Sequence, residues 1–133
     1  MTAVRALWAR DRLGFLLAAI AAATVVSGLV QLVAPGFVLD LLDAESTETT
    51  RHFFGIVGMF MAIVGGLLLH ALLRPPPPPG FVVLWASLQK LGACLAVAIG
   101  VGRDVFSELA LLVAGFDLLT AVIGALFLWR ARP

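Results

Sequence analysis

Four long apolar stretches constrain the fold of this sequence more than any other feature. They run approximately over residues 13–33, 52–73, 81–101 and 106–129. Each has the roughly 20 residues that an α-helix needs to cross about 30 Å of hydrocarbon, where every backbone polar group must be satisfied within the segment. The sequence therefore predicts an all-α fold, an integral membrane bundle of four helices in up-down order.

The composition excludes a water-soluble globule. Apolar residues make up 62% of the 133-residue chain and charged residues only 13%, and the mean hydropathy is +1.08. Because so few charges cannot cover a small, surface-rich protein, most of the surface must face lipid. A chain of this length forms a single domain, residues 1–133, and its net charge of +1 without a basic run argues against a nucleic-acid partner.

Arginines are distributed unevenly between the two sides of a four-pass topology. Six of the eight lie before the first span, after the second or after the fourth, namely Arg5, Arg10, Arg12, Arg74, Arg130 and Arg132. The two loops on the other side hold six acidic residues and two arginines. The tryptophans Trp8, Trp85 and Trp129 lie near the arginine-rich ends, where indole rings favour the headgroup layer. By the positive-inside rule, we expect both termini to be cytoplasmic.

Two connections have structure of their own in this topology. Residues 36–43 mix apolar and acidic side chains, which predicts a short interfacial helix, and Ser46 is placed to cap the helix that follows. Residues 75–80 are five prolines and a glycine, which cannot continue a helix. They predict a stiff cytoplasmic spacer in the polyproline II conformation, with a ligand for a proline-binding domain as the alternative.

Lys90 and Asp117 stand out inside the spans, because ionisable groups near the bilayer centre are costly without a partner. Each lies eleven residues from the outer end of its span, counted from Val101 and Phe106, which is about 16.5 Å of helix. Adjacent antiparallel helices would place both at the same depth, so we predict an intramembrane ion pair. Two roles are open for it: a structural salt bridge, or a site that handles protons or anions.

Other polar and small residues in the spans form rows at helical spacing. The candidates to line a path to the pair are Thr24, Ser27, Gln31, Ser87 and Thr120. The row formed by Thr24, Ser27, Gly28 and Gln31 is also typical of a packing seam. Small residues recur at every fourth position at Gly58, Ala62 and Gly66, and again at Gly92, Ala96 and Gly100. These rows predict close helix packing or a homo-oligomeric seam.

Patterns of catalytic and cofactor sites are missing from the sequence. His52 and His70 lie 18 residues apart on one span, about 27 Å, so they cannot hold one haem iron within a monomer. Cys94 is the single cysteine, which excludes an intrachain disulfide and a cysteine-based metal site. Because no nucleophile and base can be paired either, we expect no enzyme activity, no metal and no other cofactor.

Three segments resemble the DoxX-like group of small bacterial four-pass membrane proteins. They are Arg51–Gly58 at the start of the second span, Leu88–Gly92 in the third and Phe116–Leu119 in the fourth, and the resemblance covers most of residues 13–129. It implies a compact up-down four-helix bundle in a bacterial cytoplasmic (inner) membrane. It also implies an accessory role beside membrane redox enzymes, or a function that is unassigned in the group.

The leading functional hypothesis is a non-catalytic integral membrane protein. Its partners would be the lipid bilayer and either further copies of itself or the subunits of a larger membrane assembly, for example a redox assembly. The alternative is a small proton- or anion-coupled transporter or channel that uses the pair of Lys90 and Asp117. A third hypothesis is an enzyme that acts on a lipid or a quinone.

Overall fold

The computed structural model describes residues 5–7, 11–74 and 80–130, so the proline segment 75–79 lies outside the described residues. The elements are α2 (Arg12–Val33), α3 (Pro35–Leu41), α4 (Glu48–Leu73), α5 (Gly80–Gly102) and α6 (Ala110–Arg130). The helices α2, α4, α5 and α6 are each long and apolar enough to cross a membrane. The chain is therefore all-α in its described part, with four candidate membrane-spanning helices, as the sequence predicts.

Side-chain caps fix where the first two long helices begin. Asp11 caps α2 and accepts a backbone N–H of the first turn. Thr47 caps α4 by accepting the backbone N–H of Thr50 at 3.2 Å, and Glu48 in the first turn interacts favourably with the helix dipole. The expectation that Ser46 is this cap is therefore wrong by one residue. With this cap, α4 begins one residue after the start that a Ser46 cap predicts and four residues before the apolar stretch 52–73.

The fourth long helix, α6, begins at Ala110, four residues after the expected start of its span. Turns precede it, and within them the backbone N–H of Ser107 donates to the carbonyl oxygen of Leu42 at 2.8 Å. The ring of Phe106 folds back over Gly100, where an added Cβ would come within 2.6 Å of Phe106 Cδ2. The loop between α5 and α6 is thereby held against the end of α5 and against the loop that follows α3.

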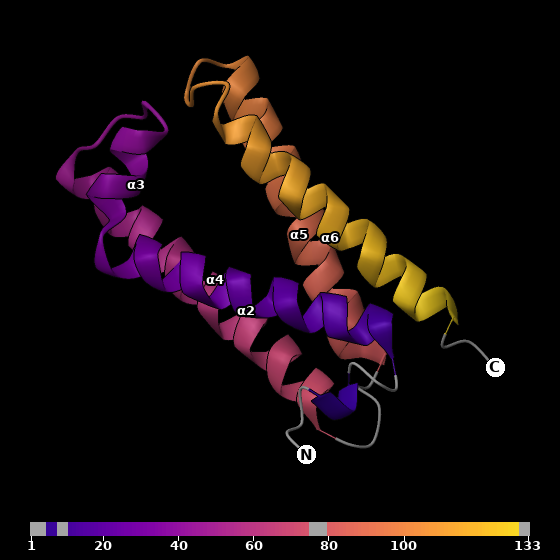
Figure 1. Cartoon of the computed structure of the whole chain (residues 1–133). Coiled ribbons are helices and arrows are strands. Elements are labelled where there is room, and N and C mark those ends of the chain that lie inside the picture. Colours follow the sequence, from indigo (N-terminus) through magenta and orange to yellow (C-terminus); the bar gives the residue numbers. More distant parts are fainter. Residues whose placement is uncertain (1–4, 8–10, 75–79, 131–133) are drawn as a thin grey trace.

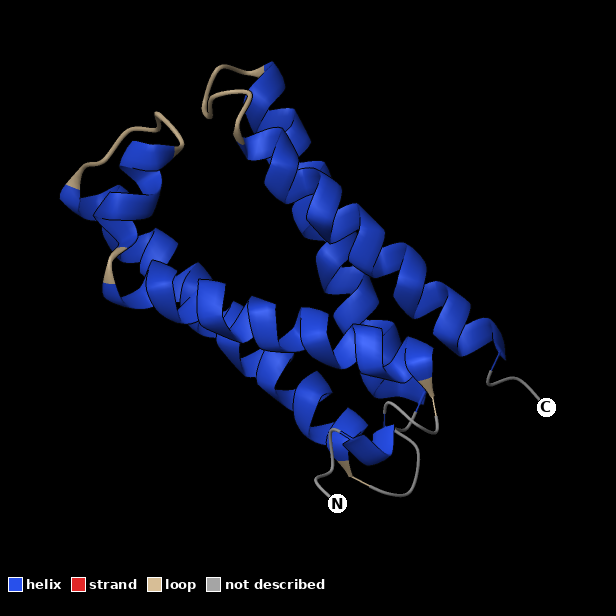
Figure 2. Cartoon of the chain, viewed as in Figure 1, coloured by secondary structure: helices blue, strands red, loops and turns tan. Residues whose placement is uncertain are grey.

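The four long helices form two antiparallel hairpins, α2 with α4 and α5 with α6 (Figure 1). Within each hairpin the helices pack along their length, whereas among the described residues the helices of one hairpin touch those of the other only through short parts of α2 with α6 and of α4 with α5. The loops that follow α3 and α5 meet through the hydrogen bond between Ser107 and Leu42. Figure 2 shows the hairpins diverging from one end of the molecule. We call this the closed end, where α2 begins and α6 ends, and the opposite end, with loops 42–47 and 103–109, the open end.

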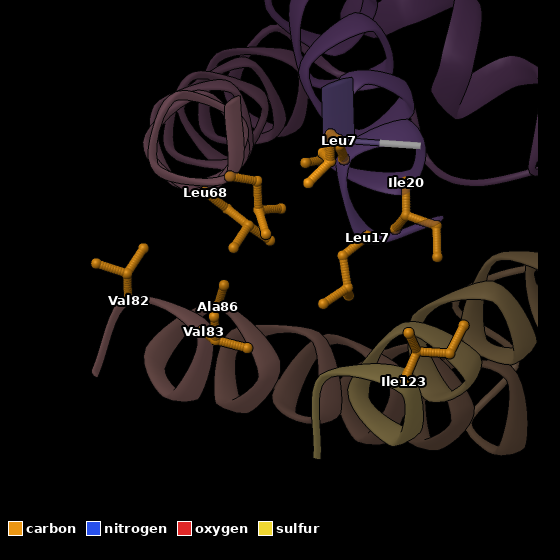
Figure 3. Close-up of a cluster of buried hydrophobic side chains, with 11 residues drawn as sticks. Leu7, Leu17, Ile20, Leu68, Val82, Val83, Ala86 and Ile123 are labelled. Atoms are coloured by element: carbon orange, nitrogen blue, oxygen red, sulfur yellow. The ribbon is translucent and has the colours of Figure 1, made fainter. Parts of the chain in front are cut away.

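The apolar core lies at the closed end. Figure 3 shows its side chains facing one another across the two hairpins. Among its members are Leu17 and Ile20 of α2, Leu68 and Leu72 of α4, Val82, Val83 and Ala86 of α5, and Ile123 of α6. Val83 is completely buried there. Toward the open end this core gives way to polar side chains.

Candidate functional site

Four polar side chains are buried among the described residues, and they mark the level at which the hairpins part. They are Thr24, Lys90, Asp117 and Thr120, each no more than 4% exposed. Thr24, Lys90 and Thr120 each lie one helical turn beyond a core residue of the same helix, namely Ile20, Ala86 and Ile123 respectively. The helical period that builds the apolar core thus also places a polar layer directly above it.

An ion pair forms the centre of this polar layer. Lys90 Nζ of α5 donates to Asp117 Oδ1 of α6 at 2.7 Å, and both side chains are about 95% buried. The ammonium also lies 5.4 Å from the centroid of the Phe116 ring, within the range of a cation–π contact. The ion pair therefore joins α5 to α6 inside the hairpin, away from solvent.

Two hydroxyl groups near the pair bond to their own helices. Ser87 Oγ donates to the Val83 carbonyl oxygen at 2.8 Å, and Thr120 Oγ1 donates to the Phe116 carbonyl oxygen at 2.8 Å. Gly124 provides the space for Ser87, whose Oγ occupies the position that a Cβ at this glycine would take. Since each hydroxyl uses its proton on the backbone, each oxygen keeps the ability to accept a hydrogen bond.

A small cavity of about 10 Å³ adjoins this layer between the hairpins. Its polar lining consists of Thr24, Ser87, Gln89, Lys90 and Thr120. Thr24 Oγ1 is buried and has no hydrogen-bond partner. A cavity of this size accommodates nothing larger than a water molecule.

The structure brings some of the predicted polar lining together and separates the rest. Thr24, Ser87 and Thr120 line the small cavity with Lys90. Ser27 is exposed and donates to the Thr24 carbonyl oxygen at 3.2 Å. Gln31 packs against Gly58 of α4 with its Oε1 buried and without a hydrogen-bond partner. Neither Ser27 nor Gln31 lines the cavity.

A second hollow, of about 570 Å³, lies at the open end. It is bounded by the loop before α4, the first three turns of α4 and the loop between α5 and α6. Carboxylates of Asp43, Glu45 and Asp104 and rings of Phe53, Phe54 and Phe106 contribute to its lining. Sequence reasoning missed this groove, because its acidic residues come from two loops that are far apart in the sequence and meet through the hydrogen bond between Ser107 and Leu42.

The histidines and the cysteine are dispersed. His52 and His70 are both exposed, near the first and last turns of α4, and Cys94 is half-buried on α5. Within residues 5–7, 11–74 and 80–130, no three His, Cys, Asp or Glu side chains are grouped so that they could hold a metal ion.

Comparisons of this chain with family models, with curated proteins and with solved structures give no match.

Proposed function

We propose that this chain is a non-catalytic membrane protein that associates with a second copy of itself through an outward-facing stripe on α5. The stripe consists of Gly92 and Ala96. The observation on which the proposal rests is a contrast between small residues that are packed inside the chain and the same kind of residue left uncovered on this helix.

Inside the chain, small residues bring two helices into backbone contact. A Cβ at Gly28 of α2 would lie 2.6 Å from the Gly58 carbonyl oxygen, and one at Gly58 of α4 would lie 2.5 Å from the Gly28 carbonyl oxygen. In lipid, helices gain little from hiding apolar surface, so association depends on close packing of this kind. Small residues at a helix surface are therefore a means of association.

On α5 the corresponding residues face away from the rest of the chain. A Cβ at Gly92 would meet no atom within 4 Å, and Ala96, one turn further on, is exposed. Gly100, the third member of this row, is covered by Phe106. The uncovered part of the row supports contact with a helix of another chain, and a second α5 related by two-fold symmetry offers the same small surface.

Cysteine cross-linking in membranes tests this proposal. In a Cys94→Ala background, Ala96→Cys is expected to form a disulfide-linked dimer under mild oxidation, and adding Gly92→Leu is expected to abolish it. Gly115→Cys on α6 is the matched control, because its Cβ position is also open but leucines lie four residues to either side. Equal cross-linking at both positions, or a strictly monomeric particle by native mass spectrometry in gentle detergent, would contradict the proposal.

The DoxX-like resemblance supports a second form of this proposal, in which the α5 stripe contacts another subunit of a membrane redox assembly. Gly92 belongs to Leu88–Gly92, one of the segments on which the resemblance rests. The same cross-linking experiment in native membranes distinguishes the two forms. A product of twice the mass of the chain supports self-association, and a product of any other mass supports an accessory role.

We also propose that both termini are cytoplasmic and that the membrane is a bacterial inner membrane. Support comes from the arginine distribution and, for the bacterial membrane, from the DoxX-like segments. With Cys94→Ala as background, a cysteine at Ala44 is expected to react with an impermeant thiol reagent added to intact cells, and one at Ala131 is not. Equal labelling at both positions, or labelling at Ala131 alone, would overturn the proposed orientation.

Transport is a second candidate function, favoured by the position of Lys90 and Asp117 where the two hairpins part. Buried charges inside membrane spans often belong to ion or proton pathways. A flux assay in sealed vesicles with protons, anions and hydrophobic cations tests this candidate. Asp117→Asn, which keeps the shape and removes the charge, is expected to abolish any flux that depends on the pair.

A further inference from the structure

We propose that the small cavity beside Lys90 binds one water molecule, which links Thr24 of α2 to Lys90 of α5. This water joins the two hairpins at the level where they part. The proposal does not depend on self-association or on transport.

Size and polarity both favour a single water. The cavity measures about 10 Å³, close to the space that one water molecule requires. Buried cavities that remain empty are apolar, whereas the lining of this one, although largely apolar, also includes Lys90 and three residues that carry a hydroxyl group. An inorganic anion is larger than the cavity and would also lie beside the Asp117 carboxylate.

The surrounding groups supply the hydrogen bonds that a buried water needs. Lys90 Nζ has three donors and the structure gives it one acceptor, Asp117 Oδ1. Thr24 Oγ1 is buried without a partner and can both donate and accept. Ser87 Oγ and Thr120 Oγ1 keep free lone pairs, because their protons bond to backbone carbonyl oxygens. A water that accepts from Lys90, bonds to Thr24 and donates to either hydroxyl has about three partners, which is typical of buried water.

The position of this water lets it link the two hairpins, which the ion pair does not do. Lys90 and Asp117 lie on α5 and α6, so their bond acts within one hairpin. Thr24 lies on α2, in the other hairpin, and the hairpins share few contacts. The water therefore extends the polar layer from one hairpin to the other.

The substitution Thr24→Val tests the proposal, because it should lower the melting temperature if the water is bound and should not lower it if the water is absent. Valine keeps the shape of threonine and removes the hydroxyl. If the hydroxyl bonds to water, its loss also deprives Lys90 of a partner, and the melting temperature should fall by about 4 °C. If the hydroxyl is unpartnered, removing a buried polar group should leave the melting temperature unchanged or raise it, which would overturn the proposal.

Two further variants separate the water from other effects of Thr24. Thr24→Ser retains the hydroxyl and is expected to preserve the water, although it loses a methyl group that lies near Gly65. In the Lys90→Met, Asp117→Leu double variant, the water has lost its strongest donor, so Thr24→Val should no longer lower the melting temperature. If Thr24→Val lowered the melting temperature equally in the unaltered protein and in the double variant, Thr24 would act without Lys90, and the proposal would also be overturned.

A direct measurement on the unaltered protein does not depend on how variants fold. Lys90 is the single lysine, so ¹⁵N-lysine labelling yields one side-chain ammonium signal. In bilayers, proton-detected NMR is expected to show magnetisation transfer from a bound water to the Lys90 ammonium, and this transfer should be lost in Thr24→Val. Absence of the transfer in the unaltered protein would refute the proposed site.

Discussion

The two hairpins hold their helices together in different ways. In the α2–α4 hairpin, Gly28 and Gly58 allow the two backbones to touch. In the α5–α6 hairpin, an added Cβ at Gly92 or Gly115 would meet no atom within 4 Å, Gly124 makes room for the Ser87 side chain, and a buried ion pair joins the two helices. The first hairpin thus brings two backbones into contact, whereas the second combines side-chain packing with a buried polar bond.

This difference shows that the two kinds of helix contact are sensitive to different kinds of substitution. Close packing is sensitive to added volume, because an extra methyl group must displace backbone atoms. A buried ion pair is sensitive to a lost partner, because the remaining charge is stranded in an apolar environment. Substitutions of each kind should therefore damage one hairpin and spare the other.

The largest effect is expected at the ion pair. Lys90→Met or Asp117→Leu alone should lower the free energy of unfolding by about 3–5 kcal/mol, since each strands a buried charge, whereas the double variant should be nearly neutral. Unfolding measured for the two single variants and the double variant gives the interaction energy directly. A double variant whose loss equals the sum of the single losses would show that the two side chains do not stabilise each other.

The same double variant separates the two roles that are open for the pair. If the pair is structural, the double variant should fold and retain its oligomeric state and every membrane activity. If the pair transports protons or anions, the double variant should fold and lose flux. On one sample of the double variant, the stability measurement therefore tests the structural role of the pair, and the flux measurement tests its role in transport.

An intermediate effect is expected where the helices of the first hairpin touch. Gly58→Ala places a methyl group against the Gly28 carbonyl oxygen and should cost about 1–3 kcal/mol in unfolding free energy. Gly66→Ala on the same helix is the matched control, because its Cβ position has no atom within 4 Å. This control should be neutral or stabilising by up to about 1 kcal/mol. Equal effects of the two substitutions would show that the contact at Gly58 does not hold the hairpin together.

Much of the secondary structure follows from the sequence because hydrocarbon permits few alternatives to a helix of about 20 apolar residues. The ends of the helices follow less well. They depend on contacts made by residues outside the apolar stretch, such as the Thr47 cap and the fold of Phe106 over Gly100. Hydropathy does not record these contacts, so α4 begins four residues before its apolar stretch and α6 begins four residues after the expected start of its span.

The arrangement of the polar layer could be predicted only in part. Equal depth on antiparallel helices predicts that Lys90 and Asp117 meet, and their charged atoms lie 2.7 Å apart. Helical spacing places Thr24 and Gln31 on one face of their helix, yet only Thr24 reaches the cavity. Gln31 lies seven residues closer to the open end of α2, where the hairpins diverge, and the spacing of residues within one helix does not encode how two hairpins diverge.

The smallest effect is expected from the contact between Lys90 and the Phe116 ring. With Nζ 5.4 Å from the ring centroid, Phe116→Leu should cost about 0.5–1 kcal/mol of unfolding free energy beyond the change in packing. Phe60→Leu on α4, which also replaces an exposed phenylalanine, controls for lost ring surface. In the Lys90→Met, Asp117→Leu background the excess cost should disappear, because no cation remains. If the excess cost in unfolding free energy persisted in that background, Phe116 would stabilise the α5–α6 hairpin by packing. Packing would then contribute to the second hairpin as it does to the first.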